Sequence, residues 1–418
     1  MKKMKKVLLC GKLFDAKDGS VKMDQAVWVE ENRIVDVTSG QGLNLGGEVE
    51  VIDLSDKFVM PGLIDAHLHI GYAGGKSITE RDEPPEMVVT KAVKNARENL
   101  KGGFTTVRDM NFPTLAGSPS IRDAIDKGWM PGPRIFSCGH AITQTGGHTA
   151  IVYPQERFGQ MMFKPVGTCD SPDEVRTAAR TVLKFGADQL KLMVTGGITS
   201  PSGGVGDQNM SYEEIVAAVE VGKMHNRLVS VHAHGTSGIR DAAKAGVSSI
   251  EHCTMVDDEG IDYMLKNNVV AVPTLIVTQL LANGADKGLS AATVEKAKFL
   301  APQHAANIKK AYDRGVRCIF GTDAGTPLGI HGHQHAEFQH MENAGISKVD
   351  VLLAATRYAA EFIRWDNKLG TIETGKLADI VAIDGDPMTD MSVMHRDKVA
   401  FIMKDGVVYK EKGTFYHI

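Results

Sequence analysis

Apolar and polar positions follow two different patterns along the chain. Short apolar runs broken by glycine and acidic residues fill the first 57 residues and return after residue 370, as in KVLLCGKLFD and VAFIMKDGVVYK. Such runs are typical of β-strands. Between these two regions, apolar strands alternate with helical stretches such as SPDEVRTAARTVLKF. We predict that residues 1–57 and 370–418 form one small β-sandwich domain and that residues 58–369 form an α/β domain.

The middle region contains eight strand candidates with helical patterns between them. They lie at residues 63–67, 104–108, 133–138, 188–193, 228–232, 248–252, 269–272 and 317–321. Eight parallel strands, each followed by a helix, make up a TIM barrel. The chain has no internal sequence repeat or low-complexity tract that would favour a solenoid. The predicted fold class is therefore α/β, a (β/α)8 TIM barrel with an additional β domain.

Six side chains able to bind metal lie at or just beyond the ends of these apolar runs. In chain order they are His67, His69, Lys191, His232, His252 and Asp323. A TIM barrel collects its chemical groups at the C-terminal ends of its strands, so these residues are expected at one rim. Imidazole nitrogens and carboxylate oxygens from separate strands suit zinc or a similar divalent ion. The order and context predict a metal-dependent hydrolase.

His67 and His69 are two residues apart, and alternate residues of a strand point to the same side. Both can therefore bind one ion, although a pair with this spacing also arises by chance. Lys191 cannot bind metal as an ammonium ion. A carbamate formed from its neutral amine and carbon dioxide would be an anion that bridges two metals. The alternative is a lysine at a strand end with its ammonium group in water, and the surrounding ligands favour the carbamate.

His232 and His252 follow strand candidates one βα unit apart and together could hold a second ion. Structural histidines are the alternative. His234 shares a face with His232, and we expect it to turn toward the substrate. Asp323, in GTDAG, is predicted to bind the first metal and to take a proton from a metal-bridging water. A turn or helix-capping aspartate is the alternative for this residue.

Composition excludes several classes of function. The chain has 47 basic and 51 acidic residues, a formal net charge of -4, and no basic stripe, so we expect no nucleic-acid partner. No apolar run approaches the roughly 20 residues of a membrane span, and the run after the N-terminal lysines is too short for a signal peptide. Five widely spaced cysteines without a CxxC pair argue against a disulfide framework. We therefore predict a cytoplasmic protein that does not bind membranes.

With these residues in place, the chain resembles the amidohydrolase superfamily, the binuclear kind with a lysine carbamate. The matching motifs are VMPGLIDAHLH, KLMVTGG, VHAHG, IEHC, FGTDAG and GTIETGKLADIVAIDGDP. TTVRDM, CGHAITQTGGH and KLMVTGGITSP are similar to the prolidase-like branch, which includes dipeptidases, arginine-type carboxypeptidases and ochratoxin-hydrolysing amidases. The resemblance implies hydrolysis of a peptide or amide bond next to a C-terminal amino acid.

The resemblance also implies the role of each residue. His67, His69 and Asp323 would bind one divalent ion, with zinc as the expected metal. His232 and His252 would bind the other, and the carbamate of Lys191 would bridge the two. All six residues are present in this chain. His140 would donate a hydrogen bond to the carbonyl oxygen as it becomes an oxyanion, whereas the alternative is an ordinary loop histidine.

The residues that select the substrate are harder to predict from the pattern. The stretch from Gly139 to Asp170 could form a lid in which Met161, Met162 and Phe163 pack on an apolar substrate group, or it could be an ordinary loop. Lys76, Arg81 and Arg157 are candidates for binding a substrate carboxylate, and surface charges are the alternative for each.

Two further pairs have structural interpretations. His331 and His335, in GIHGHQHAEFQH, could share a helical face, and a loop leading into a surface helix explains the segment better than a third metal site. His331 could still border the substrate. Arg108 and Asp109, at the end of the second strand candidate, are expected to form a structural ion pair.

The predicted function is hydrolysis of dipeptides or N-acyl amino acids by a dipeptidase or carboxypeptidase type of enzyme. A cyclic amide hydrolase or a deaminase acting on a heterocycle is the first alternative, because related barrels use similar metal sites. A noncatalytic barrel is the second alternative, and retention of all six ligands argues against it. The sequence leaves the oligomeric state open, a homo-oligomer included.

Overall fold

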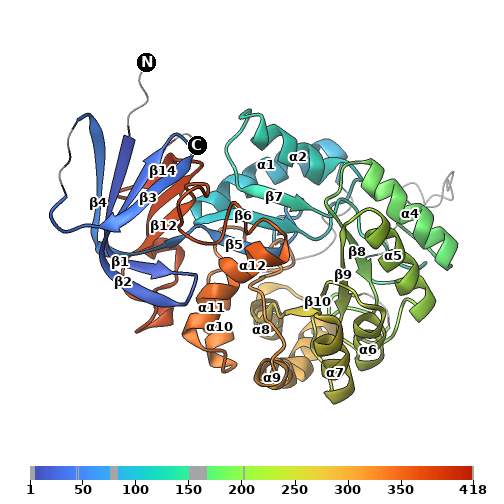
Figure 1. Cartoon of the computed structure of the whole chain (residues 1–418). Helices are drawn as coiled ribbons and strands as arrows, with labels where there is room; N and C mark the ends of the chain where they lie inside the picture. The colour runs from blue at the N-terminus through green and yellow to red at the C-terminus, as the bar shows by residue number, and fades with distance from the viewer. Residues whose placement is uncertain are drawn as a thin grey trace.

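The computed structural model describes residues 5–43, 45, 47–75, 83–149, 167–200 and 203–416. Strands and helices fall into two regions, a sheet built from both chain ends and a larger α/β region (Figure 1). The helices are α1 Pro85–Lys101, α2 Gly117–Asp126, α4 Pro172–Lys184, α5 Tyr212–Met224, α6 Thr236–Ala245, α7 Asp258–Asn267, α8 Leu275–Ala282, α9 Ala291–Asp313, α10 Ala336–Asn343, α11 Lys348–Ala354 and α12 Arg357–Phe362. Short 3-10 helices lie at Ala285–Lys287, Met391–Val393 and Arg396–Lys398.

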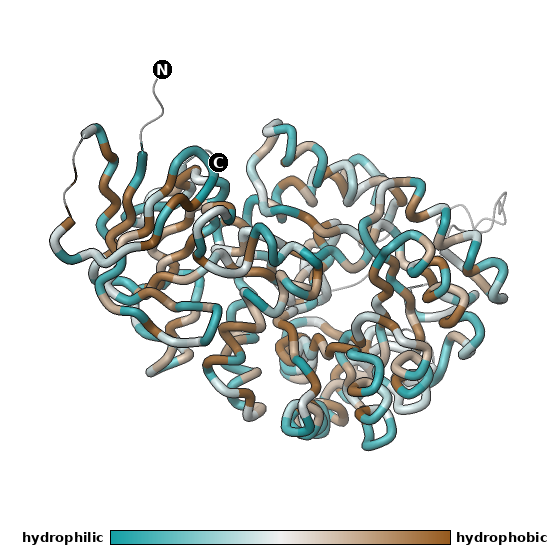
Figure 2. Tube along the Cα trace, in the orientation of Figure 1, coloured by the Kyte–Doolittle hydropathy of each residue, from teal (hydrophilic) through white to brown (hydrophobic). Residues whose placement is uncertain are grey.

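The two chain ends share one eight-stranded sheet. Its strands are β1 Lys5–Asp15, β2 Ser20–Glu30, β3 Arg33–Ser39, β4 Val49–Pro61, β12 Ile380–Ile383, β13 Val399–Lys404, β14 Val407–Glu411 and β15 Thr414–Phe415. Their order is β15-β14-β13-β12-β4-β1-β2-β3, so the antiparallel pairing of β12 with β4 joins the ends. The strands expected in a sandwich are thus hydrogen-bonded as one continuous sheet. Apolar residues are concentrated along them (Figure 2).

Seven of the eight predicted parallel strands are present in the middle region. They are β5 Leu63–Leu68, β6 Phe104–Asp109, β7 Arg134–Ser137, β8 Gln189–Met193, β9 Leu228–Ala233, β10 Ser249–His252 and β11 Val270–Val272. They form a three-stranded sheet, β5-β6-β7, and a four-stranded sheet, β11-β10-β9-β8. Helices lie around the outside of these strands (Figure 1).

Backbone hydrogen bonds join the two parallel sheets at both junctions. Between β7 and β8, Asp188 N donates to Ser137 O over 2.7 Å. The eighth predicted strand, 317–321, is not a regular strand, yet Ile319 N donates to Ala271 O at 2.8 Å and Ala66 N donates to Phe320 O at 2.9 Å. Hydrogen bonds therefore lead from β5 through every strand and back to β5.

Gly321 explains part of the close approach at that junction. A Cβ built on this residue would lie 2.8 Å from the Cβ of His67, closer than real side chains allow. The glycine thus lets the segment before Asp323 run directly beside β5. Asp323 comes next to His67, near the end of β5, and to His69, just beyond it.

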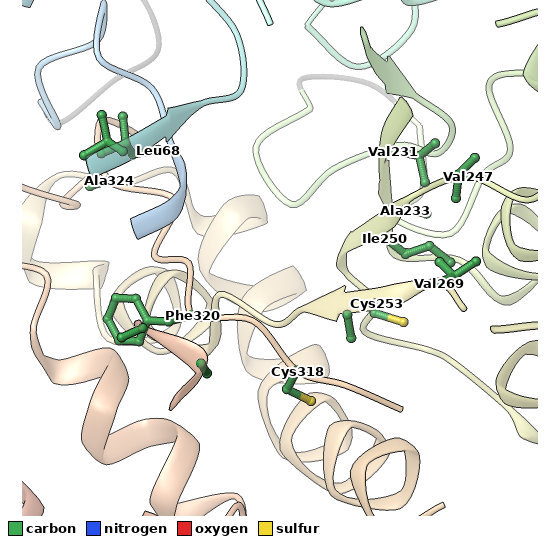
Figure 3. Packing of buried hydrophobic residues seen from close by; sticks show 14 of the residues in the cluster. Leu68, Val231, Ala233, Val247, Ile250, Cys253, Val269, Cys318, Phe320 and Ala324 are labelled. Carbon is green, nitrogen blue, oxygen red and sulfur yellow. The ribbon is translucent and has the colours of Figure 1, made fainter. Parts of the chain in front are cut away.

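The main core lies between the parallel strands and their helices. Val231 of β9 and Ile250 of β10 are adjacent in register and fully buried, and Figure 3 shows them together with Leu68 and Phe320. None of the five cysteines forms a disulfide. Within the described ranges, no helix has both the length and the apolar character that crossing a membrane requires.

Candidate metal centre

The six predicted ligands meet at the C-terminal ends of the parallel strands. His67 lies in β5, Lys191 in β8, His232 in β9 and His252 at the end of β10. All six line one pocket, whose free space is about 800 Å³ including its opening. Its wall also contains His234, His148, Tyr72, Asn111, Met193, Ile198, Val277 and Leu281.

The first ligand group consists of His67, His69 and Asp323. Asp323 Oδ1 lies 3.4 Å from His67 Nε2 and 3.0 Å from His69 Nε2. Burial opposes ionisation of Asp323, but the two neighbouring imidazoles outweigh it and hold the pKa of the carboxyl below its usual range. His67 Nε2 and Asp323 Oδ1 are buried and make no hydrogen bond to any described residue. Such unsatisfied atoms fit a metal ion between them.

The second ligand group contains the predicted ligands His232 and His252. His234, which we expected to turn toward the substrate, lies with them, and the three rings offer ligand atoms within 4.8 Å of one another. Burial, reinforced by neighbouring charges, lowers the pKa of His232 and His252 well below the usual value and that of His234 to about 3. His234 Nδ1 lies 2.7 Å from Thr254 Oγ1, and His252 Nδ1 lies 2.7 Å from Thr274 Oγ1. These contacts leave Nε2 of each ring for a metal, because metals bind neutral imidazole.

Lys191 is buried and lines the same pocket. Burial lowers the pKa of its ammonium group to about 8. A neutral amine is the form that reacts with carbon dioxide, and the resulting carbamate would bring negative charge to the second ligand group. The donor set therefore fits two divalent ions.

Two ligands sit where the backbone adopts the left-handed region. His252 has φ 66° and Asp323 has φ 60°. For residues other than glycine this conformation is uncommon and often occurs at functional sites. The turn that follows β10 and the turn at Asp323 thus set the direction of two side chains, which no hydrophobic pattern could have predicted.

Comparison with known proteins agrees with this geometry. A model described as the amidohydrolase family matches residues 58–409. The chain belongs to the amidohydrolase family. The ochratoxinase of Aspergillus niger is 30% identical over 379 residues, which cover 85% of this chain and 76% of that protein.

Solved structures support the branch of the amidohydrolase family predicted above. A Xaa-Pro dipeptidase with bound methionine in its active site has a TM-score of 0.88 and 37% identity, covering 97% of this chain and 100% of that chain. The resemblance to prolidase-like members and ochratoxinase is thus confirmed.

The sequence comparison also found an imidazolonepropionase from Geobacillus sp., which is 24% identical over 388 residues, covering 86% of this chain and 83% of that protein.

The amidohydrolase site contains a buried ion pair that the sequence reading did not find. Arg108 Nη2 donates to both carboxylate oxygens of Glu251, at 2.8 and 2.7 Å, and Glu251 Oε2 lies 2.7 Å from His67 Nδ1. The predicted pair of Arg108 with Asp109 is wrong, because adjacent strand residues point to opposite sides. Asp109 instead accepts from Ile70 N at 2.9 Å.

The charge of Glu251 follows from its partners. Burial raises the pKa of this carboxyl, but Arg108 and His67 lower it by more, to about 2. A signal was present in the sequence, since Glu251 lies at an inward position of β10 and follows the small Ser249 and the apolar Ile250. Two inward charges on separate strands could have been paired on that basis.

His331 lies behind the first ligand group, away from the pocket wall formed by described residues. Its Nε2 is 2.9 Å from Tyr72 O and 3.2 Å from His69 O, and its Nδ1 is 3.0 Å from Asn99 Nδ2. His335 Nε2 contacts Gly102 O at 2.8 Å. His331 precedes helix α10 and His335 is its N-cap residue, so the two do not share a helical face.

His140 is also buried beside the pocket and does not form part of its described wall. Its Nδ1 lies 2.9 Å from Phe112 O. A role for His140 or His331 in contacting substrate stays a prediction. Six further candidates lie outside the described residues: Lys76, Arg81, Arg157, Met161, Met162 and Phe163.

Two pocket residues were missed by the sequence reading. The ring of His148 stacks on His232 with centroids 4.3 Å apart, and its Nδ1 lies 2.8 Å from Ser200 Oγ. The ring of Tyr72 meets His69 edge-on with centroids 5.7 Å apart. The histidine of GGH was the available signal for His148, although a loop position gives no direction to its side chain.

Proposed function

We propose that this amidohydrolase is a two-metal hydrolase that cleaves an amide bond next to a C-terminal amino acid, in dipeptides or N-acyl amino acids. The proposal includes a closed (β/α)8 barrel in which residues 317–321 serve as the eighth strand. The convergence of all six predicted ligands on one pocket carries it. The likeness of the chain to an ochratoxinase and to a Xaa-Pro dipeptidase supports an amide bond as the bond that is cleaved.

The first ligand group would hold one ion and the second group the other, with the carbamate of Lys191 between them. Divalent ions, with zinc as the expected metal, would supply Lewis acidity that acidifies a water and polarises the amide carbonyl. The unsatisfied His67 Nε2 and Asp323 Oδ1 are the observation that favours such ions.

Side chains of the protein would transfer the proton and hold the substrate. Asp323 lies at the boundary of the pocket with one oxygen unsatisfied, so it can accept a proton from the attacking water and pass it to the leaving amine. Apolar residues of the wall would hold the substrate near the ligands and exclude water. These include Ile198, Val277 and Leu281.

The proposal can be tested with metal-analysed protein and an array of dipeptides and N-acyl amino acids. Mass spectrometry would report which free amino acids are released. We expect release from a subset of the array, and loss of that release after chelation. Absence of turnover across the array by protein that holds two ions per chain would contradict the proposal.

A cyclic amide hydrolase is the second candidate, favoured by the likeness to imidazolonepropionase. It would use the same pocket on a heterocycle. Deaminases commonly use one metal, so two ions per chain would argue against a deaminase. Ring opening of imidazolone or dihydropyrimidine substrates, with no cleavage of the dipeptide array, would favour this candidate.

A further inference from the structure

We propose that Arg108 and Glu251 are positioning residues that fix the tautomer and the orientation of the metal ligand His67. The inference deepens the proposed function, since it rests on His67 binding a metal through Nε2. The buried ion pair itself does not line the pocket.

The contacts place Glu251 between a permanent cation and the ligand. Arg108 binds the carboxylate through Nη2 at 2.7 and 2.8 Å, and His67 Nδ1 approaches Oε2 at 2.7 Å. Ser249 Oγ donates to Oε1 at 2.5 Å. Both Arg108 and Glu251 are fully buried, so water does not compete for these contacts.

Arg108 is itself held in one orientation. Its Nε donates to Ala66 O, and its Nη1 donates to Ser230 Oγ at 2.8 Å. The guanidinium therefore links β5, β6, β9 and β10 beneath the pocket. A guanidinium cannot lose its proton in a protein, so it keeps Glu251 anionic.

An anionic carboxylate only accepts hydrogen bonds. His67 Nδ1 must then carry the proton, and the lone pair is left on Nε2. That atom faces Asp323 Oδ1 at 3.4 Å, and neither atom has a hydrogen-bond partner among the described residues. The ion pair thus aims the lone pair of His67 at the place where the first ion would bind.

The energetics of buried charges favours a role in positioning His67 over a role in stabilising the fold. Burying two charges carries a desolvation penalty, so a buried ion pair is weak evidence for stability. Partners behind a metal-binding histidine typically change metal affinity about 10–100-fold when removed. We therefore expect the pair to matter more for metal binding than for folding.

The central test is Glu251→Gln. Its amide can donate as well as accept, so the tautomer of His67 is no longer imposed. We expect zinc affinity, measured by competition with a chromophoric chelator, to fall about 10–100-fold. In metal-free protein, ¹⁵N NMR of labelled histidine should change from Nδ1-protonated His67 to a mixture of tautomers, with His67→Ala identifying the signal.

Two further variants separate positioning from folding. Arg108→Gln combined with Glu251→Gln removes both charges, so it leaves no lone buried charge, and we expect zinc affinity to stay low even where the melting temperature recovers. Asp379→Asn disrupts another buried pair, Arg134 with Asp379. It should lower the melting temperature without a change in zinc affinity beyond about twofold.

Several outcomes would overturn the inference. Nε2-protonated His67 in the metal-free wild type would do so, even if Glu251→Gln fails to fold. An equal loss of zinc affinity in Asp379→Asn would show a general effect of destabilisation. The tautomer measurement needs neither substrate nor bound metal, so failure of the proposed amide hydrolysis would leave its result unchanged.

Discussion

The two ligand groups of the site differ in how the protein supports them. The first group contains a carboxylate, Asp323, and is backed by a second one, Glu251. The second group consists of three imidazoles whose Nδ1 or Nε2 atoms contact neutral hydroxyl or carbonyl oxygens. Negative charge is therefore concentrated on one side of the pocket.

This difference indicates that the second group depends on an anion from elsewhere. Three neutral imidazoles bind a divalent ion without compensating its charge, whereas the first group does so through Asp323. The carbamate of Lys191 would supply the missing negative charge. This difference between the two groups can be tested by substituting, in turn, each residue that supplies charge to a ligand group or orients a ligand.

The largest effect is expected from Lys191→Ala. We expect turnover to fall to background and metal content to decrease, with the second ligand group losing its ion first. Metal analysis of the purified variant, together with turnover on the best substrate, would measure both. Formate, which offers a small carboxylate, is the matched addition and should restore part of the activity. Two retained ions with full turnover would contradict the bridging role.

Asp323→Asn should have the next largest effect. The amide keeps the size of the side chain but cannot accept the proton in the proposed mechanism, so turnover should fall about 10²–10⁴-fold. Circular dichroism should show an unchanged fold. Because the residue is also a proposed ligand, metal content must be measured in parallel. An unimpaired rate would exclude Asp323 as the proton carrier.

Thr274→Val tests the neutral support of the second group. Valine has the same branched shape, so a β-branched residue occupies the positive φ of 50° at this position in both proteins. Loss of one neutral hydrogen bond to His252 corresponds to about 1 kcal/mol, or roughly a fivefold loss of zinc affinity. Chelator competition would measure it. A loss as large as that of Glu251→Gln would remove the distinction between the two groups.

Much of the fold and the ligand set followed from the sequence, for identifiable reasons. Apolar runs predicted seven strands, and the ligands lie at their ends because strand direction is fixed by the βα repeat. The segment 317–321 is not a regular strand, although it keeps hydrogen bonds to Ala271 and Ala66, and Gly321 packs closely beside His67. Propensity carries no information about that contact.

The contacts that support the ligands were predictable only in part. Strand alternation places Glu251 and Arg108 inside, yet their pairing depends on the register of strands that are far apart in sequence. The loop position of His148 and the positive φ of His252 depend on tertiary packing alone. The error of pairing Arg108 with Asp109 came from reading sequence neighbours as spatial neighbours.

The smallest effect is expected from His148→Phe, on the side of the second group. Phenylalanine retains an aromatic ring to stack on His232, where the centroids are 4.3 Å apart, but it removes the hydrogen bond to Ser200 Oγ. We expect zinc affinity to change less than threefold and KM to rise more than kcat falls, because His148 borders the pocket without belonging to either ligand group. Ser200→Ala is the matched control for the hydrogen bond. A loss of zinc affinity comparable with that of Thr274→Val would mean that His148 also supports the second ion. The two ligand groups would then differ mainly in the charge of the residues that support them, and less in the number of those residues.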